Sequence, residues 1–306
     1  MAPSPLSILN VTIFTVILLP LLCSSRPVDT RLNNPVIRYH NGPLLTGNIK
    51  LAILFYGNFG NVHKQAITVF VKSLNTINAA PEPSVATWWR TIESYQSAAK
   101  HGGVSPRINV QIFKKVDDVS YSVGKIITQD FIATLVQKAT GGDKTVLPVI
   151  FAAKDVSIVG ACTGKCSSHG TVGTGRAAQP YIMVGNPEVE CPETCAWPFY
   201  GAAIPLSPPS GNAGADALVL GLATALAGTV SNPYNTGFFQ DPVDRPLEAV
   251  TACPAKFGSG ALPGNPGKVL LDPKTRTAFN AHGVRGQNFL LPAVWNPTTK
   301  SCWTLV

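Results

Sequence analysis

The stretch Lys50-Leu51-Ala52-Ile53-Leu54-Phe55-Tyr56 decides the fold class of this 306-residue chain. After Lys50 every residue in it is apolar, and Gly57 ends the run. A short apolar run without polar alternation is typical of a strand that is buried on both faces of a sheet. Because helices must then cover both faces, the stretch predicts a central strand of an α/β fold.

Helix and strand patterns alternate on either side of this strand. Ile67, Phe70, Val71 and Leu74 are spaced i, i+3, i+4 and i+7, which predicts an amphipathic helix. Ser84 is placed to be the N-cap of a second helix. The apolar stripe of that helix comprises Val85, Trp88, Trp89, Ile92 and Tyr95.

Further along the chain, we expect strands over residues 109–113, 146–152 and 181–184 and a helix over residues 126–136. Pro148 weakens the second of these strands, because proline cannot donate a hydrogen bond to a neighbouring strand. From Thr251 onward, closely spaced glycines and prolines predict turns and hairpins. The alternation as a whole predicts a single layered α/β domain with a central sheet.

Residues 215–230 are rich in alanine and glycine and contain one charged residue, Asp216. A helix that is apolar on all sides is typically buried in the middle of a domain. We therefore expect one buried Ala/Gly-rich helix inside the layered fold.

The first 25 residues contain no Lys, Arg, Asp or Glu. An apolar stretch over residues 11–19 is followed by Pro20 and by the small residues Cys23, Ser24 and Ser25. This pattern predicts a secretory signal peptide over residues 1–25, cleaved near Ser25, and a mature domain over residues 26–306. The alternative is a membrane anchor, which the break at Pro20 disfavours. If the signal peptide is cleaved, we expect the mature chain to have no membrane span.

Six cysteines remain once Cys23 leaves with the signal peptide. An even number in a secreted chain predicts three disulfides, for which 15 connectivities exist. We expect the four cysteines between residues 162 and 195 to pair among themselves and the last two to form the third bridge. The alternative for the two Cys-x3-Cys pairs is a metal site, which the two-residue spacing of zinc ribbons disfavours. The six are Cys162, Cys166, Cys191, Cys195, Cys253 and Cys302.

The net charge is +8, although only 13% of the residues are charged. The basic residues are scattered and not interleaved with aromatic residues, which argues against a nucleic-acid partner. An extracellular basic protein is attracted to polyanionic matrix. The partner that the charge favours is therefore a polyanionic extracellular matrix.

The motifs of the common enzyme and cofactor classes are not found. Ser259 lies between Gly258 and Gly260 but not in a Gly-x-Ser-x-Gly motif, and no two histidines are spaced i, i+4 as in helical zinc proteases. Cys166 and His169 are close enough in sequence for a thiol and its base, but a cysteine in a disulfide is no nucleophile. We therefore expect no catalytic residue, no cofactor and no metal ion, and His169 as a hydrogen-bonded loop histidine.

Several long motifs resemble the plant EXORDIUM, or phosphate-induced, protein family. They are Tyr39-His-Asn-Gly-Pro-Leu-Leu-Thr-Gly47, Pro83-Ser-Val-Ala-Thr-Trp-Trp89, Cys191-Pro192 with Cys195-Ala-Trp-Pro-Phe199, Leu226-Ala-Gly-Thr-Val-Ser-Asn-Pro233 and Leu247-Glu-Ala-Val250. The resemblance extends from about residue 38 to the C-terminus. It implies a secreted, apoplastic cell-wall protein that is linked to brassinosteroid-responsive cell expansion, growth and development. It implies no established enzymatic activity and supplies no catalytic residues. With the positive net charge, it implies an acidic cell-wall polysaccharide or an apoplastic receptor as the partner.

A second likeness concerns residues 224–233, which resemble the zinc helix of some bacterial secreted zincin-type proteins. Thr224 then stands in place of the first histidine ligand, Ala225 in place of the general base and Gly228 in place of a further ligand. Ala and Gly have no side-chain donor atom, and a neutral Thr hydroxyl is a poor zinc ligand. The helix is thus either a degenerate relic in a zincin-like fold or an ordinary core helix.

The alternative function is a cell-wall hydrolase that acts on glycans, or a degenerate zincin-type metalloprotein. A glycan hydrolase needs a pair of carboxyl groups as acid and base. The candidates fall in two clusters of acidic residues along the sequence. The first comprises Glu188, Glu190 and Glu193, and the second Asp241, Asp244 and Glu248. By default, we interpret both clusters as solvated residues on the protein surface. The main expectation is therefore a non-enzymatic binding or signalling protein.

Overall fold

The computed structural model describes residues 35–76, 80–100, 102–163 and 165–306. The predicted signal peptide over residues 1–25 lies outside the described residues, so its cleavage and the start of the mature domain stay predictions.

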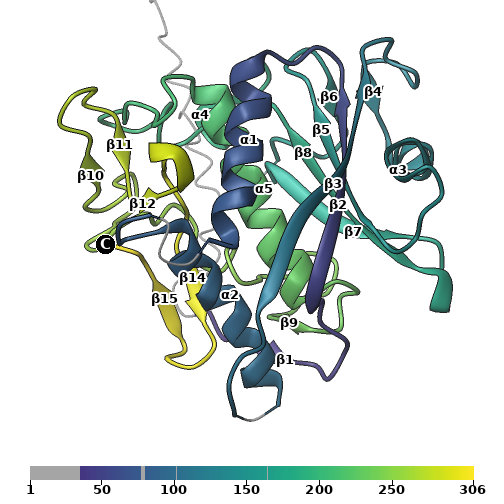
Figure 1. The fold of residues 1–306 in the computed structure, drawn as a ribbon, viewed down its shortest axis with the longest axis horizontal. Coiled ribbons are helices and arrows are strands. Elements are labelled where there is room, and N and C mark those ends of the chain that lie inside the picture. The colour runs from purple at the N-terminus through teal and green to yellow at the C-terminus, as the bar shows by residue number, and fades with distance from the viewer. Residues whose placement is uncertain (1–34, 77–79, 101, 164) are drawn as a thin grey trace, which may run out of the picture.

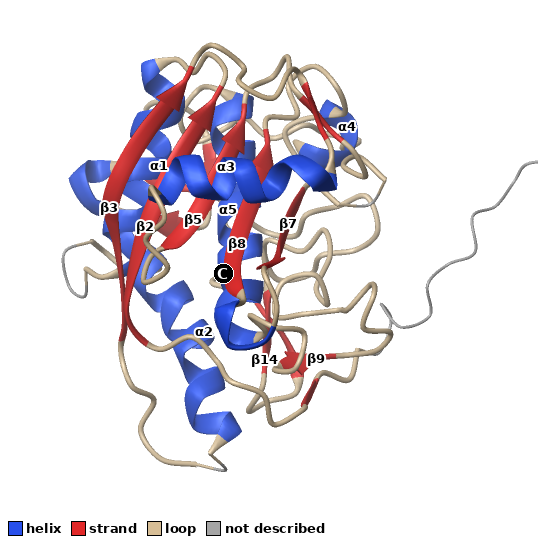
Figure 2. Ribbon diagram, turned by 90° about the vertical axis from the view of Figure 1, so that its right-hand side faces the viewer, coloured by secondary structure: helices blue, strands red, loops and turns tan. Residues whose placement is uncertain are grey.

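A five-stranded mixed sheet forms the centre of the fold, with strand order β3-β2-β5-β8-β7. Four strands run parallel: β2 (Gly47–Tyr56), β3 (Ile108–Asp118), β5 (Leu147–Ala152) and β8 (Gln179–Gly185). The edge strand β7 (Ser167–Val172) is antiparallel to β8. Figure 2 shows this order across the sheet, with β3 at one side and β7 at the other. The sheet confirms the predicted strands, including the one that contains Pro148.

Successive side chains of β2 enter two different cores, as its apolar sequence predicts. Leu51, Ile53 and Phe55 belong to the core beneath the larger helices, and Leu54 and Tyr56 belong to the core on the opposite face. All five are at most 1% exposed. Burial on both faces therefore explains why this strand has no polar alternation.

Helices cover both faces of the sheet (Figure 1). α1 (Asn61–Leu74), α2 (Val85–Ala99) and α5 (Ala213–Ser231) lie on one face, and α3 (Ile132–Thr140) lies on the other. The predicted N-cap of α2 is confirmed, because the Ser84 hydroxyl accepts a hydrogen bond from the Thr87 N–H at 3.1 Å.

The prediction of one helix over residues 126–136 is wrong at its start. Residues Ile126–Ile127 form β4, which pairs in parallel with β6 (Ser157–Ile158). The short 3₁₀ helix η2 (Gln129–Phe131) then precedes α3. The pairing with β6, 31 residues along the chain, takes the backbone hydrogen bonds that a helix would have used.

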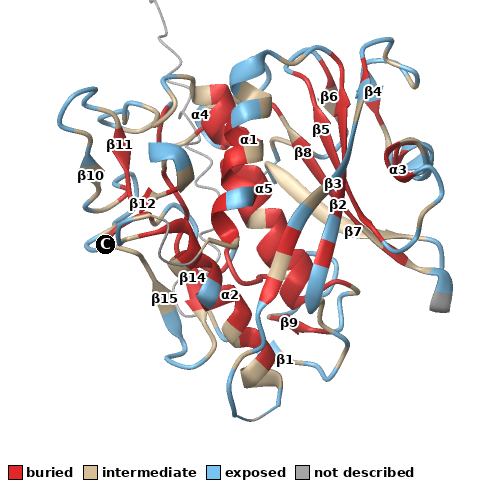
Figure 3. Cartoon of the chain, viewed as in Figure 1, coloured by how far each residue is buried: buried red, intermediate tan, exposed pale blue. Residues whose placement is uncertain are grey.

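α5 passes through the middle of the molecule, and almost all of its residues are buried (Figure 3). By length and composition it is the one helix among the described residues that is apolar enough to cross a membrane, but 89% of the apolar segment is buried inside the fold. The Asn212 side chain caps its first turn by accepting from the Ala215 N–H at 2.8 Å. α5 is thus the core helix between the sheet and the C-terminal segments.

Short strands and hairpins follow α5, and those from residue 270 onward lie on the side of the helices away from the sheet (Figure 1). They confirm the prediction of turns and hairpins for the last third of the chain. β1 (Arg38–Tyr39) pairs with β9 (Phe238–Phe239). The three C-terminal pairs are β10 (Leu270–Leu271) with β11 (Ala278–Phe279), β12 (Ala281–His282) with β13 (Asn288–Phe289), and β14 (Val294–Asn296) with β15 (Ser301–Trp303).

Three disulfides staple these parts of the fold. Cys162 bonds to Cys191, Cys166 to Cys195 and Cys253 to Cys302. The four-residue helix α4 (Pro192–Cys195) connects the first two bridges. The prediction that the first four cysteines pair among themselves, and that the last two form the third bridge, is confirmed.

Candidate functional site

A cavity of about 470 Å³ lies along one side of α5, and we call it the α5 groove. Its walls are mainly apolar and include Trp197, Leu220, Val250 and Phe257. Cys166, Cys195 and Cys253, each held in a disulfide, also line it. Bridges on two sides therefore hold the walls of this groove in place.

A second cavity of about 150 Å³ continues from the α5 groove along the helix, and we call it the polar end. The two cavities share Lys165, Ser167, Thr224, Val250 and Thr251 as lining residues. Five polar side chains line the polar end but not the α5 groove: Ser168, His169, Asn235, Asp244 and Glu248.

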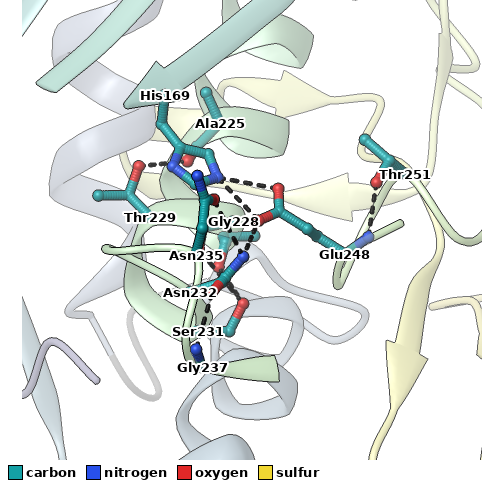
Figure 4. Close-up of polar contacts among 11 residues, drawn as sticks. His169, Ala225, Gly228, Thr229, Ser231, Asn232, Asn235, Gly237, Glu248 and Thr251 are labelled. Atoms are coloured by element: carbon teal, nitrogen blue, oxygen red, sulfur yellow. Dashed lines mark hydrogen bonds and ion pairs between the residues drawn. The ribbon is translucent and has the colours of Figure 1, made fainter. Parts of the chain in front are cut away.

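His169 and Glu248 form an ion pair or hydrogen bond at this end (Figure 4). The imidazole Nε2 lies 2.8 Å from Oε2 and 3.0 Å from Oε1 of the carboxylate. Only 8% of the His169 side chain and 9% of the Glu248 side chain are exposed. The Asn232 amide donates to Glu248 Oε1 at 2.6 Å, and the Glu248 N–H donates to the Thr251 hydroxyl at 2.8 Å.

Gly228 on α5 makes room for this pair. A Cβ atom at residue 228 would lie 2.8 Å from Glu248 Oε2 and 2.9 Å from His169 Nε2, closer than real Cβ contacts come. Only glycine therefore lets the imidazole and the carboxylate lie directly on the helix. At the residue that the sequence likeness compared with a metal ligand, the structure places two side chains from other parts of the chain.

The other two residues compared with a zinc helix also face this region. Thr224 lines both cavities, and Ala225 lines the polar end. The Ala225 carbonyl accepts a hydrogen bond from the Thr229 hydroxyl at 2.7 Å. No zinc-binding side chain comes from these residues, and the relation of α5 to a zinc helix stays a prediction.

His169 was expected in a loop, and this expectation is wrong, because His169 lies in β7 opposite Ile182 of β8. The sequence Ser-Ser-His-Gly-Thr-Val has neither an apolar run nor regular alternation, so β7 was not predicted. It becomes a strand because β8 offers a partner edge. A run of small and β-branched residues after a cysteine was the only local signal.

The His169–Glu248 pair suits a structural role better than acid–base catalysis. Nε2 is engaged by the carboxylate, and Nδ1 is buried without a hydrogen-bond partner among the described residues. A general base must lie within hydrogen-bond reach of the substrate proton that it takes. Neither nitrogen is open to a substrate in this arrangement.

The carboxylates proposed for a glycan hydrolase are not gathered around one centre. Glu188 lies 3.7 Å from Lys154 Nζ and 3.8 Å from His63 Nε2, outside the groove. Glu190 and Asp241 are exposed and line neither the groove nor its polar end. Glu193 lines the apolar part, and Asp244 and Glu248 line the polar end.

The sulfur atoms of Cys162, Cys191 and Cys195 lie within 4.8 Å of one another, a separation that would suit a metal ion. All three are in disulfides, however, and zinc binds the thiolate form of cysteine. These residues therefore form structural disulfides, and of the three only Cys195 lines the α5 groove.

Asp216, the one charged residue of α5, is buried in the first turn of the helix. Burial raises its pKa to about 7, although hydrogen bonds from the backbone and hydroxyl of Ser210 oppose the shift. It lines neither the α5 groove nor the polar end. Asp216 therefore concerns the stability of the helix start.

Known plant proteins resemble this chain over most of its length. Residues 37–305 match the family model described as phosphate-induced protein 1 conserved region. "Protein EXORDIUM-like 2" of Arabidopsis thaliana is 42% identical over 283 residues, which is 89% of this chain and 90% of the relative. "Protein EXORDIUM" of the same plant is 38% identical and covers 93% of each chain. "Protein PHOSPHATE-INDUCED 1" of Nicotiana tabacum is 38% identical and covers 89% of each chain. No solved structure matches the chain, so the zincin-like arrangement stays a prediction.

Proposed function

Because the chain belongs to the family of EXORDIUM and phosphate-induced proteins, we propose that it is a secreted cell-wall protein that regulates growth by binding a ligand, without catalysis. The resemblance drawn from the motifs is thereby confirmed as a family assignment. The names of the three relatives above denote no enzyme, which supports a regulatory role. A role in brassinosteroid-dependent cell expansion is the finer part of the proposal and rests on the family resemblance.

The α5 groove is the observation that carries the binding function. Its volume of about 470 Å³ falls within the range of small-ligand sites, roughly 300–1,000 Å³. Apolar walls with a few polar groups at one end are typical of such sites. Since disulfides hold two sides of the groove, a ligand would meet a largely preformed surface, which lowers the entropic cost of binding.

Secretion is supported by the three disulfides and by the predicted signal peptide. Disulfides form and persist in oxidising compartments such as the secretory route and the cell exterior. The net charge of +8 favours retention on an acidic wall polysaccharide through long-range attraction. That attraction is screened by salt, since the Debye length falls from about 10 Å at 0.1 M to about 3 Å at 1 M.

The location is tested by expressing the tagged full chain in plant cells and comparing the apoplastic wash, the wall fraction and the cell interior. A chain that lacks residues 1–25 is the matched control. We expect the full chain in the wall fraction, released by about 1 M salt, and the truncated chain inside the cell. Retention of the full chain in intracellular membranes would contradict secretion, and resistance to salt would contradict electrostatic retention.

Catalysis is tested by incubating the purified, disulfide-bonded protein with wall polysaccharides and analysing the soluble products. We expect no product above that of a heat-denatured sample. If oligosaccharides appear and Glu193→Gln or Glu248→Gln abolishes them, the non-enzymatic function is wrong and the glycan hydrolase takes its place.

A further inference from the structure

β7 leaves one edge of the central sheet open. It pairs with β8 on one side, and no other backbone hydrogen bond is made by residues 167–172 within the described part of the chain. All six residues of β7 are partly exposed. The N–H and C=O groups on its outer side are therefore available to another extended strand.

The opposite edge of the sheet is protected in the usual way, and β7 is not. β3 carries the exposed charged residues Lys114, Lys115 and Asp117, which discourage pairing with another strand. β7 has no Lys, Arg, Asp, Glu or Pro. The contrast between the two edges indicates that β7 is the one at which a strand can be added.

Cavities lie on both faces of this open edge. On the α5 side, Ser167 and His169 face Gly221 and Gly228, beside the α5 groove and its polar end. On the other side lies a cavity of about 270 Å³, which we call the β6–β7 cavity. Its lining includes Gln129, Ile158, Ser168, Tyr181 and Met183. Because side chains of an added strand point alternately to the two faces, one set would enter the α5 groove and the other the β6–β7 cavity.

The two cavities differ in chemistry. The α5 groove has Trp197 and Phe257, whose ring centroids are 5.6 Å apart, and suits a large apolar side chain. Lys165 lines both cavities. In the α5 groove the acidic Glu193 accompanies it, whereas in the β6–β7 cavity Lys165 is the only Lys, Arg, Asp or Glu, beside the hydroxyls and amide of Ser168, Tyr181 and Gln129. Those groups suit an acidic side chain, and the net charge of +8 attracts an acidic chain as a whole.

We propose that the open edge of β7 binds an extended peptide of alternating acidic and large apolar residues, which adds a strand to the sheet. Main-chain hydrogen bonds to β7 provide affinity, and the two cavities select the alternating side chains. This inference deepens the proposed binding function and rests on it.

The probe is the peptide acetyl-Glu-Phe-Glu-Phe-Glu-Phe-amide, titrated into the purified, disulfide-bonded protein. Two derivatives carry N-methyl groups, one on all Phe nitrogens and the other on all Glu nitrogens. In an added strand, alternate N–H groups point toward β7 and away from it. We therefore expect one derivative to bind at least about tenfold more weakly, since each lost hydrogen bond costs about 0.5–1.5 kcal/mol. The other derivative should bind within about twofold of the parent.

Two charge-reversal variants provide a matched comparison. Lys165→Glu removes the cation that lines the β6–β7 cavity and the adjoining rim of the α5 groove. Lys72→Glu makes the same change in net charge on the exposed side of α1. We expect Lys165→Glu to weaken the peptide about two- to fivefold, as for a partly exposed ion pair, and Lys72→Glu to have little effect. Equal effects of the two variants would overturn the proposal in favour of attraction by net charge alone.

Three further outcomes would also overturn it. The first is that the peptide shows no saturable binding up to millimolar concentration. The second is that both N-methylated derivatives bind equally weakly. The third is that an acidic oligogalacturonide displaces the peptide while N-methylation has no effect on its affinity. Wall retention of the protein with any of these results would leave the proposed function standing and refute only the peptide site. If the peptide binds as expected but the protein is not secreted, the peptide site stands and the proposed cell-wall function is refuted.

Discussion

Replacing Gly228 by alanine tests whether the His169–Glu248 pair is held directly on α5. The new methyl group would lie 2.8 Å from Glu248 Oε2 and 2.9 Å from His169 Nε2, so at least one of the two side chains must move. Both side chains are more than nine-tenths buried, and Asn232 also hydrogen-bonds the carboxylate. Movement would therefore leave a buried charged or polar group without its partner.

Two opposing effects determine the magnitude. Alanine in a helix interior is more favourable than glycine by about 1 kcal/mol. Breaking a buried ion pair by losing one partner costs roughly 3–5 kcal/mol. We therefore expect Gly228→Ala to lower the free energy of unfolding by about 2–4 kcal/mol.

The assay is urea unfolding of the disulfide-bonded protein, followed by tryptophan fluorescence, for Gly228→Ala, His169→Ala and the double variant. Without the imidazole, the Glu248 carboxylate has space to move away from the methyl group. In the His169→Ala background, the glycine replacement should thus be neutral or stabilise by about 1 kcal/mol. If it costs the same in both backgrounds within about 0.5 kcal/mol, the steric argument is refuted.

Three other substitutions test the stability of the same framework. Burial raises the pKa of Asp216 from 3.8 to about 7, so its contribution to stability is fully present below pH 3.8 and is lost as the pH rises through about 7. Unfolding free energies of the wild type and Asp216→Asn from pH 3 to pH 8 should diverge by up to about 4 kcal/mol, and parallel pH profiles would contradict this. Replacing both Cys253 and Cys302 by serine opens a bridge with a sequence separation of 49, and urea unfolding should show a loss of about 4 kcal/mol; an unchanged midpoint would argue against it. Ser84→Ala removes the cap that accepts from the Thr87 N–H and should cost about 1 kcal/mol by thermal unfolding, whereas no shift would mean that the cap is dispensable.

Local patterns in the sequence were sufficient for most of the central fold. The apolar run that forms β2 is recognisable because burial on both faces leaves no polar residue among the six from Leu51 to Tyr56. The spacing in α1 and the N-cap of α2 are also contained within one or two helical turns. The six cysteines beyond the predicted signal peptide indicated three bridges, and the motifs identified the family.

The site could not be obtained in the same way. His169 was named as a histidine and Glu248 as an unplaced carboxylate, but 79 residues separate them along the chain. Their contact depends on space above Gly228, and a glycine in a helix gives no local sign of what packs against it. The α5 groove likewise combines β7, α5 and the segment after residue 250.

The sequence by itself determined the elements whose signals lie within a few residues: the buried strand, the amphipathic helices and the hairpin-rich C-terminal part. It also determined that six cysteines were present to form three disulfides. Only the tertiary structure decided that residues 126–127 pair with β6, that β7 is a strand with an open edge, and that His169 meets Glu248 over α5. The physical reason is that hydrogen bonding and burial within an element follow local periodicity. Pairing between distant segments depends instead on which free edge and which empty space the assembled core leaves for them.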